Sequence, residues 1–403
     1  MKLIIGAGQA GGHAAMAIRA AGHAGRIILL GDEPHAPYER PPLSKAMLTE
    51  EPAPPIQYFH DPARLAAQSI ELRLGTRAEG IDAHARRVHL SGGETLPYDD
   101  LLLATGGRPR RLAIPGGETV LYLRTIEDAA RIRARLLPGA NIVCIGAGVI
   151  GLEIAASARA CGCAVTVLEA GPGVMGRSLT PDFAAYIAAL HASQGVDIRL
   201  GVRIEAIAAN HVLTDTGRIP ADMVVAGIGI ARNTELAESA GAGLDNGILV
   251  DEFGRTNVPG IHAAGDVAAF WHPLFQRRLR LETWRNAQNQ GIAVGRVMAG
   301  GGTPYDDIPW FWTDQHGINL QLAGLPDLAT TTIWRGTLGD PSFTGFHLDA
   351  SGRLAAATGV NAPREIRAAM ALIAARATVD PAALADPSIP PQRLVADLRK
   401  RAG

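Results

Sequence analysis

The sequence predicts an α/β protein with two Rossmann-like, three-layer dinucleotide-binding domains and a small α+β domain at its C-terminal end. Three observations carry this prediction. Two glycine fingerprints stand at residues 6–11 and 146–151, and each follows a short apolar run and opens an alanine-rich helix pattern. Beyond residue 309 the pattern changes to short alternating runs followed by one helix. A strand, a glycine-rich turn and a helix in this order are typical of dinucleotide binding.

The glycines of such a fingerprint have separate tasks. The first permits a tight turn from strand to helix, the second lets the backbone approach a pyrophosphate, and the third lets the helix pack closely on the strand. The phosphates then lie at the N-terminus of the helix. The two sets are Gly6, Gly8 and Gly11, and Gly146, Gly148 and Gly151. Two sets in one chain predict two bound dinucleotides.

An acidic residue follows the next strand after each fingerprint. The first helix pattern, residues 14–21, leads to an apolar strand at 26–30 that ends at Gly31-Asp32-Glu33. The second, residues 155–160, leads to a strand at 164–168 that ends at Glu169. A carboxylate there accepts hydrogen bonds from ribose hydroxyls and repels the 2′-phosphate of NADP. Glu169 therefore favours NADH over NADPH.

The order of the elements predicts that the first domain is discontinuous. Residues 1–107 and 231–309 would form one dinucleotide-binding domain, because an apolar strand ending at Gly265-Asp266 returns to it with a carboxylate at the ligand-binding edge of the sheet. Residues 108–230 would form the inserted second domain, with strands at 199–206, 211–215 and 223–228. Residues 310–403 would form the third, with strands at 318–322, 330–335, 343–348 and 354–360 and a helix at 364–376.

Composition excludes several classes of function. The net charge of −1 over 403 residues gives no overall reason to expect nucleic acid or an anionic membrane as partner. No uninterrupted apolar run reaches the roughly 18 residues of a membrane-spanning helix. Residues 1–5 resemble the start of a signal peptide, but glycines then interrupt the apolar core that a signal needs. We therefore expect a soluble, cytoplasmic enzyme.

Cysteines and lysines are both scarce. Cys144, Cys161 and Cys163 all lie within the second nucleotide-binding pattern, and their spacing does not match the Cys-x-x-Cys of a disulfide relay. We expect them to fill the core, and we expect no metal site. Lysine occurs only at positions 2, 45 and 400 among many arginines. Lys45 therefore indicates either a site that requires a compact ammonium group or an ordinary surface lysine.

The chain resembles, over essentially its whole length, the two-dinucleotide flavoprotein reductases of the glutathione reductase type, specifically the ferredoxin reductases of bacterial oxygenase systems. The most specific motif is Tyr38-Glu39-Arg40-Pro41-Pro42-Leu43-Ser44-Lys45, with Ala104-Thr105-Gly106-Gly107-Arg108-Pro109 and Gly265-Asp266 as further matches. The motifs at residues 282–291 and 310–315 make it more similar to the reductases of biphenyl-type aromatic ring-hydroxylating dioxygenases than to those serving cytochromes P450.

The resemblance implies two sets of site residues. FAD would be bound by Gly6, Gly8, Ala10, Gly11, Asp32, Arg40, Lys45, Ala78, Ala104, Thr105, Gly106, Arg124, Gly265, Asp266, Glu282, Thr283 and Trp284. NADH would be bound by Gly146, Ala147, Gly148, Val149, Ile150, Gly151, Glu153, Glu169, Arg177 and Gly229. Lys45 beside the isoalloxazine, Glu153 toward the nicotinamide and Trp284 against the ring system would act in catalysis. Trp310 and Trp312 belong to the motif at residues 310–315, and an equally weighted alternative is that they are only core aromatics at a domain junction.

The resemblance also implies the reaction. NADH passes a hydride to N5 of FAD, and the electrons then leave singly to an acidic [2Fe–2S] ferredoxin that feeds an aromatic ring-hydroxylating dioxygenase. A cytochrome P450 is the alternative end of the chain, and an NADH oxidase or an NADH-sensing flavoprotein are further alternatives. Basic candidates for ferredoxin docking are Arg277, Arg278, Arg280, Arg335, Arg353, Arg393, Arg399, Lys400 and Arg401. A monomer or a weak homodimer is expected.

Overall fold

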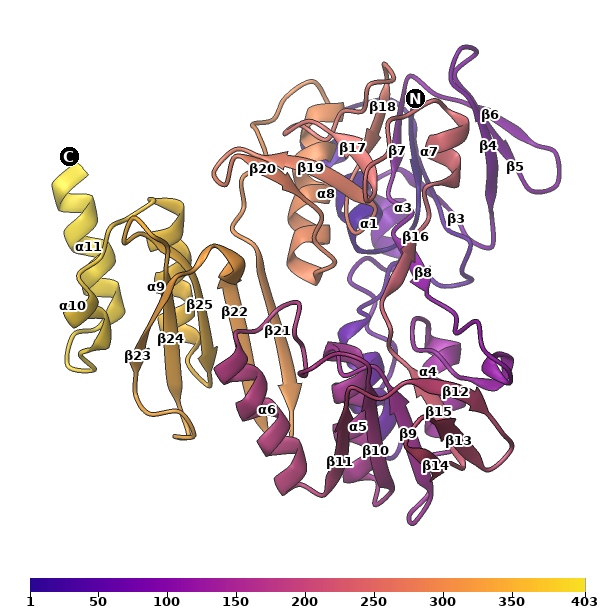
Figure 1. Ribbon diagram of the computed structural model, residues 1–403. Coiled ribbons are helices and arrows are strands. Elements are labelled where there is room, and N and C mark those ends of the chain that lie inside the picture. The colour runs from indigo at the N-terminus through magenta and orange to yellow at the C-terminus, as the bar shows by residue number, and fades with distance from the viewer. Residues whose placement is uncertain (403) are drawn as a thin grey trace. The chain divides into compact units, whose positions relative to one another are not determined.

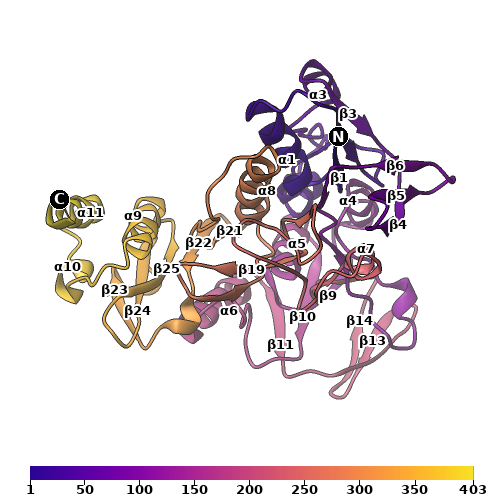
Figure 2. The same cartoon turned by 90° about the horizontal axis from the view of Figure 1, so that it is seen from above.

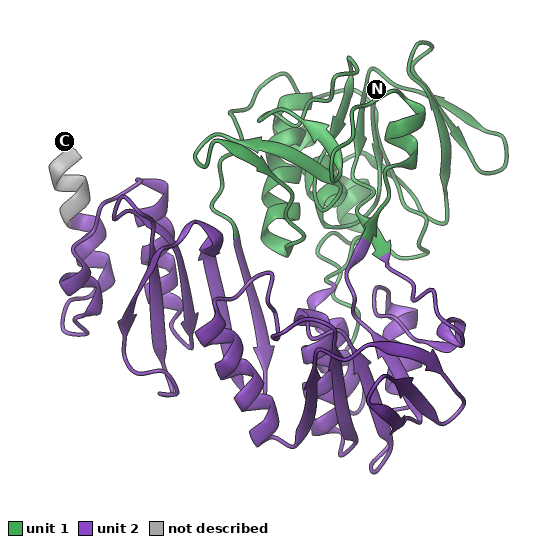
Figure 3. Cartoon of the chain, in the orientation of Figure 1, with its two compact units in different colours: residues 1–39, 55–108, 231–309 green, residues 40–54, 109–230, 310–403 purple. Residues whose placement is uncertain are grey.

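The protein is described here from a computed structural model, which describes the backbone of residues 1–402 and the side chains of residues 1–396. The chain divides into two compact units (Figure 3). Unit 1 comprises Met1–Glu39, Pro55–Arg108 and Ala231–Pro309, and unit 2 comprises Arg40–Pro54, Pro109–Ile230 and Trp310–Gly403. The division into three domains expected from the sequence therefore stays a prediction, while the α/β class is confirmed.

Unit 1 is built on a parallel sheet (Figure 1). Its strands lie in the order β18 (Ile261–Ala263), β7 (Asp100–Leu103), β1 (Lys2–Ile5), β2 (Ile27–Leu30) and β3 (Ile70–Arg73). Apart from β3, these strands are mostly apolar and buried, as is typical of a parallel sheet covered on both faces. Because all five run in the same direction, their carboxyl ends meet at one edge, where α/β proteins bind ligands.

Helices α1 (Gln9–Ala20) and α8 (Trp284–Met298) lie side by side in unit 1 (Figure 2). Their close approach depends on glycine, since a Cβ on Gly291 would lie 2.3 Å from the carbonyl oxygen of Ala10 and one on Gly295 would lie 2.6 Å from that of Ala14. Alanines of α1 and apolar residues of β1 and β2 complete this core. The alanine-rich pattern predicted α1, whereas no pattern noted in the sequence predicted α8.

Smaller elements surround the parallel sheet of unit 1. They are α3 (Pro62–Ala67), α7 (Glu235–Ser239), an antiparallel sheet of β4 (Ala78–Asp82), β5 (Arg87–Leu90) and β6 (Thr95–Pro97), and a sheet of β17 (Ile248–Val250), β19 (Ala268–His272) and β20 (Arg277–Leu279). Strand β8 (Gly107–Pro109) pairs with β16 (Ile230–Arg232).

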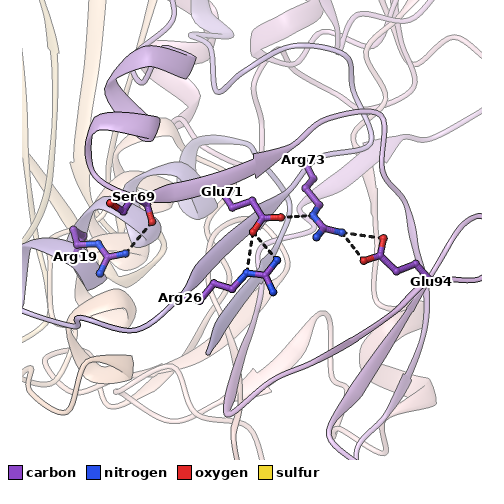
Figure 4. A network of polar contacts seen from close by, with 6 residues as sticks. All are labelled: Arg19, Arg26, Ser69, Glu71, Arg73 and Glu94. Atoms are coloured by element: carbon purple, nitrogen blue, oxygen red, sulfur yellow. Dashed lines mark hydrogen bonds and ion pairs between the residues drawn. The ribbon is translucent and has the colours of Figure 1, made fainter.

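A ladder of ion pairs runs along one edge of unit 1 (Figure 4). Arg26 and Arg73 both contact the Glu71 carboxylate at 2.7 Å, and Arg73 also contacts Glu94 at 2.8 Å. Nearby, Arg19 donates to the carbonyl of Ser69. These charges are partly exposed to solvent, so each pair is worth little, but together they join the start of β2, β3 and the turn before β6.

Unit 2 contains a second parallel sheet, in the order β11 (Val196–Leu200), β10 (Ala164–Glu169), β9 (Asn141–Ile145) and β15 (Met223–Ala226). Its helices are α4 (Ile126–Arg133), α5 (Val149–Ala160) and α6 (Pro181–Ser193), and β12 (Ile204–Ile207), β13 (His211–Thr214) and β14 (Gly217–Pro220) form an antiparallel sheet. The single strand expected at 199–206 is wrong. Gly201, with φ of +68°, ends β11, and β12 then joins the other sheet.

The last part of unit 2 is an antiparallel sheet with helices against it (Figure 1). Its strands lie in the order β21 (Trp310–Gln315), β22 (Ile318–Gly324), β25 (Leu354–Val360), β24 (Phe343–Leu348) and β23 (Thr331–Arg335). Helices α9 (Pro363–Ala374), α10 (Pro381–Ala385) and α11 (Pro391–Ala402) follow. The four strands and the helix predicted from the alternating pattern are confirmed within two residues. No helix in residues 1–402 is long and apolar enough to cross a membrane.

A fully buried histidine in this sheet makes unit 2 sensitive to acid. His347 lies between the hydroxyls of Thr332 and Thr358, each 3.0 Å from a ring nitrogen, and burial lowers its pKa from 6.5 to about 4. Below pH 6.5 the unfolded chain binds a proton at this ring that the folded chain does not bind. The contribution of the neutral His347 ring to the free energy of unfolding is therefore present above pH 6.5 and is lost as the pH falls toward 4.

When the pH falls from 7 to 4.5, the free energy of unfolding should decrease less in His347→Gln than in the wild type. The difference should be about 2 kcal/mol, because glutamine does not titrate. Urea unfolding of both proteins at the two pH values measures the difference. The exposed residue His84 provides the control, since His84→Gln should leave the loss unchanged. An equal loss in His347→Gln and the wild type would contradict the prediction.

Candidate functional site

The first glycine fingerprint forms a cradle at the N-terminus of α1 in unit 1. Gly6 has φ of +112°, and a Cβ there would lie 2.2 Å from the carbonyl oxygen of Ala104. A Cβ on Gly11 would lie 1.9 Å from the carbonyl oxygen of Gly6, whereas one on Gly8 would meet no atom within 4 Å. The turn and the helix packing therefore exclude side chains at the first and third glycines, and open space lies over the second.

This cradle suits a pyrophosphate. Gly8 is the N-cap of α1 and no side chain caps the helix, so its first amides point toward the open space. Anions bind at such N-termini. The fit supports the FAD interpretation of the first fingerprint.

Other residues predicted for FAD follow the carboxyl ends of the same parallel strands. Asp32 follows β2 and is exposed, Ala104 to Gly106 follow β7, and Gly265 and Asp266 follow β18. Thr105 is held by two hydrogen bonds with Asn233, its hydroxyl donating to the Asn233 carbonyl at 2.7 Å. Gly265 donates its amide to Gln290 on α8 at 2.8 Å and lies against Ala10. Ala78, the first residue of β4, is buried.

The N-terminus of α8 places the predicted ring-contacting residue. Thr283 caps the helix, accepting a hydrogen bond from the Asn286 amide, and Trp284 is its first residue. The Trp284 indole donates to the Glu39 carboxylate at 2.5 Å, and burial raises the pKa of Glu39 while this hydrogen bond opposes the rise. Glu282 pairs with Arg280 at 2.5 Å. Glu39, which no sequence pattern identified as the partner of Trp284, fixes the indole ring.

The second fingerprint forms a matching cradle in unit 2. Gly146 has φ of +93°, and a Cβ on it would lie 2.7 Å from the Gly227 carbonyl oxygen. A Cβ on Gly151 would lie 2.0 Å from the Gly146 carbonyl oxygen, while one on Gly148 would meet only one atom, at 3.8 Å. Gly148 is the N-cap of α5, again without a side-chain cap. The two cradles share one arrangement of contacts and open space.

The end of β10 carries the predicted ribose ligand. The Glu169 carboxylate accepts hydrogen bonds from the amides of Ala147 and Gly171, both at 2.7 Å, which hold it beside the second fingerprint. Ile150, at the start of α5, is 41% exposed, as expected for a residue against a ligand. Gly229 has φ of +93°, and a Cβ on it would lie 3.7 Å from the exposed guanidinium of Arg177. These NADH-predicted residues thus share one edge of the sheet.

A buried ion pair joins two of the predicted catalytic residues. The Lys45 ammonium lies 2.7 Å from the carboxylate of Glu153, which is only 2% exposed. The same carboxylate accepts hydrogen bonds from the hydroxyls of Ser44 and, at 2.7 Å, Thr313. The backbone of Ser44 also accepts a hydrogen bond from Ser157, one helical turn beyond Glu153 on α5. Lys45 therefore has a buried partner and is not an ordinary surface lysine.

Two further residues predicted for FAD belong to unit 2. Arg40 donates to the backbone carbonyl of Arg124 at 2.5 Å, and Asp128 accepts hydrogen bonds from the amides of Arg124 and Thr125. These contacts fix the backbone at the start of α4. Arg40, Lys45 and Arg124 thus group with the second cradle, and the other FAD-predicted residues group with the first.

None of the three cysteines is a reactive thiol. Cys144 is fully buried in β9, and burial raises its pKa to about 12. Burial likewise raises the pKa of Cys161 and of Cys163, which lie at the turn between α5 and β10 and donate to backbone carbonyls. A high thiol pKa removes the thiolate that a disulfide relay requires. Core filling, the expected role, holds for Cys144 and Cys163, whereas Cys161 is partly exposed.

Trp310 and Trp312 stack on each other on β21, with ring centroids 5.2 Å apart, and are partly exposed.

One of the expected docking arginines proves to be buried. Arg335 is 7% exposed and donates to the backbone carbonyls of Ala383, Leu384 and Ile389, so its guanidinium fixes α10 and its interpretation as a docking group is wrong. The side chains of Arg399, Lys400 and Arg401 lie outside the described residues.

Comparison with known proteins gives a consistent result. A family model described as pyridine nucleotide-disulphide oxidoreductase matches residues 2–291, and one described as reductase C-terminal matches residues 310–395. The chain is 42% identical to the ferredoxin–NAD(+) reductase component of the anthranilate 1,2-dioxygenase system of Burkholderia cepacia, with 96% of this chain and 97% of that protein covered. It is 39% identical to the putidaredoxin reductase of Pseudomonas putida, with 98% of this chain and 96% of that protein covered.

Among solved structures, the covalent putidaredoxin reductase–putidaredoxin complex contains a similar chain. The TM-score is 0.93 at 38% identity, and the alignment covers 99% of this chain and 98% of the other.

Proposed function

Because the chain belongs to the pyridine nucleotide-disulphide oxidoreductase family, we propose that it is an NADH-dependent, FAD-containing ferredoxin reductase that supplies electrons to an aromatic ring-hydroxylating dioxygenase. One observation carries the proposal: two glycine cradles for dinucleotides occur in a chain whose three thiols are all held protonated. Electrons therefore have no thiol acceptor in the protein and must leave the flavin for an external acceptor, which the proposal identifies as a ferredoxin.

Bound FAD supplies the ability to accept a hydride from NADH and to give up electrons one at a time. The protein's residues bind and orient. The amides at the start of α1 would hold the pyrophosphate, with Asp32 and Asp266 on hydroxyl groups of the cofactor. The Trp284 indole, fixed by Glu39, would pack against the ring system. Lys45 would place a positive charge beside that ring system.

For NADH, the amides at the start of α5 would hold the pyrophosphate and Glu169 the ribose hydroxyls. Arg177, exposed beside Gly229, would contact the rest of the dinucleotide. Glu153, paired with Lys45, would be directed toward the nicotinamide. The cytoplasmic location and the monomeric or weakly dimeric state stay predictions.

The experiment that tests the proposal compares electron acceptors. The purified holoenzyme should oxidise NADH slowly with oxygen as sole acceptor and at least tenfold faster when an acidic [2Fe–2S] ferredoxin is added. Equal rates would instead favour an NADH oxidase. No turnover with either acceptor, but a change in assembly on NADH binding, would favour an NADH-sensing flavoprotein.

The oxygenase at the end of the electron chain has a second candidate. A cytochrome P450 system is the alternative, because the putidaredoxin reductase is nearly as similar, at 39% identity, as the dioxygenase component at 42%. Rates with the ferredoxins of the two kinds of system discriminate between them. The higher kcat/KM identifies the natural partner.

The exposed arginine of β20 tests whether charge steers the ferredoxin. Arg278 is exposed, whereas Arg280 pairs with Glu282 and donates to the Asp266 carbonyl, so Arg278 is the better site for charge reversal. We expect Arg278→Glu to lower the rate of ferredoxin reduction severalfold at low salt and to have little effect at high salt, since screening removes steering. Flavin reduction by NADH is the internal control. An unchanged rate at low salt would exclude β20 from the docking surface.

A further inference from the structure

A chain of buried hydrogen bonds in unit 2 leads away from Glu153. The hydroxyl of Thr313 lies 2.7 Å from Glu153 Oε1, and Gln315 Nε2 lies 2.9 Å from that hydroxyl. Gln315 Oε1 lies 2.7 Å from His191 Nε2, and His191 Nδ1 lies 3.1 Å from His316 Nε2. The chain thus joins an ion-paired carboxylate to a pair of histidines through four consecutive contacts.

The interior members of this chain are shielded from water. Thr313, Gln315 and His191 are 1%, 2% and 0% exposed, and only His316, at its far end, is partly exposed. Thr313 and Gln315 stand two residues apart on β21 and therefore point to the same face of the sheet. His191 projects from α6 and Glu153 from α5. Each buried group consequently depends on its neighbours in the chain for its hydrogen bonds.

Chemistry gives the chain one direction. An ionised carboxylate only accepts, so the Thr313 hydroxyl donates to Glu153 and must itself accept from the Gln315 amide group. The Gln315 carbonyl then faces His191, which donates from Nε2 and accepts at Nδ1 from His316. The charge on Glu153 thereby selects one tautomer for each of the two imidazole rings.

The two rings are suited to this arrangement because they are neutral. Burial lowers the pKa of His191. Burial, together with the nearby His191 and Arg159, lowers the pKa of His316 to about 4. Lys45 and Ser44 lie on the other side of Glu153, so donors surround its carboxylate. Within the described residues, this carboxylate is the only negative group in direct contact with the hydrogen-bond chain.

We propose that Thr313 and Gln315 are positioning residues: they form a one-directional hydrogen-bond chain that holds one oxygen of Glu153, so that the other faces Lys45. The link to NADH rests on the proposed function, because that function directs Glu153 toward the nicotinamide. The order of donors and acceptors does not rest on it. Loss of the Thr313 hydroxyl would leave Glu153 held only at Oε2, by Ser44 and Lys45, and would free the Gln315 amide to reverse.

The test uses the holoenzyme labelled with ¹⁵N at histidine, and it has two readouts. NMR of the ring nitrogens reports which nitrogen of His191 and of His316 carries the proton, and stopped flow reports the rate at which NADH reduces the bound flavin. Both are measured for wild type, Thr313→Val and Thr313→Ser. Thr358→Val is the control, since Thr358 is equally buried but bonds His347 and lies outside the chain.

We expect both wild-type rings to carry their proton on Nε2. Thr313→Val should give a mixture of tautomers at His191 and an about tenfold slower flavin reduction, the factor that corresponds to one hydrogen bond to a charged group. Thr313→Ser should restore both, and Thr358→Val should change neither. A proton on Nδ1 of His191 in the wild type, or unchanged tautomers in Thr313→Val, would contradict the proposed order of donors and acceptors in the hydrogen-bond chain. Altered tautomers with an unchanged rate would overturn its positioning role.

If Thr313→Val slows flavin reduction as expected but the wild type reduces no ferredoxin, the failure belongs to the proposed function alone. The tautomers would still decide the chain, because they are read without any acceptor present.

Discussion

Replacing Gly11 with alanine should strongly weaken FAD binding, and replacing Gly151 with alanine should strongly weaken NADH binding while FAD is retained. The added methyl carbons would lie 1.9 and 2.0 Å from carbonyl oxygens of Gly6 and Gly146, closer than any real contact. Neither oxygen can move independently of its strand-to-helix turn, so the cradle itself must distort. Overpacking of this kind costs roughly 1–3 kcal/mol or more, which corresponds to binding weakened about fivefold to a hundredfold or more.

The two variants serve as controls for each other. The flavin content of the purified protein measures FAD binding, and a calorimetric titration with NAD⁺ measures binding at the second cradle. Gly301→Ala supplies a matched substitution, because its Cβ would meet only one atom, at 3.8 Å. If Gly11→Ala retained flavin at the wild-type level, or if Gly151→Ala lost flavin and kept NAD⁺ affinity, the assignment of the two cradles would be wrong.

Replacing Glu169 with alanine should narrow the preference for NADH over NADPH by about tenfold to a hundredfold in kcat/KM. The carboxylate is held by two amides at the end of β10, where it accepts from ribose hydroxyls and repels a 2′-phosphate. Removing the charge weakens NADH binding and relieves the repulsion of NADPH. Both changes lower the ratio of kcat/KM for NADH to kcat/KM for NADPH, so this ratio should change more than either kcat/KM value alone.

Steady-state kinetics with both coenzymes measures this ratio. Glu169→Gln separates the two causes, since the amide keeps an acceptor oxygen and loses the charge, and it should recover part of the NADH affinity while admitting NADPH. Glu205→Ala, at a partly exposed carboxylate of β12, is the control and should leave the ratio unchanged. An unchanged ratio in Glu169→Ala would mean that this residue does not contact the ribose.

The sequence predicted those parts of the fold that follow from local pattern. Both cradles were predicted because each fingerprint contains its own packing contact, of Gly11 with Gly6 and of Gly151 with Gly146. The contacts of Gly6 with Ala104 and of Gly146 with Gly227 join distant parts of the chain and could not be predicted. Strands of the last sheet were predicted because alternation of apolar residues marks them directly. The expected strand at 199–206 failed because Gly201 allows a change of direction that the apolar pattern does not reveal.

The parts of the site that were missed depend on contacts far apart in the chain. Glu39 and Trp284 stand in motifs that were noted, yet nothing in either motif indicates that they bond each other. Thr313 and Gln315 lie in the aromatic motif of β21, but their partners Glu153 and His191 are more than a hundred residues away. Arg335 was misread because a charged residue on a strand gives no signal that backbone carbonyls will surround it.

The central claim is that electrons from NADH pass through bound FAD to an external [2Fe–2S] carrier. The most direct test is an anaerobic titration of the holoenzyme with NADH in the presence of excess oxidised ferredoxin, followed by absorbance. We predict two ferredoxins reduced for each NADH and none when the enzyme is omitted. Flavin that bleaches with NADH and is reoxidised only when oxygen is admitted, while ferredoxin stays oxidised, would contradict the claim, as would purified protein without flavin.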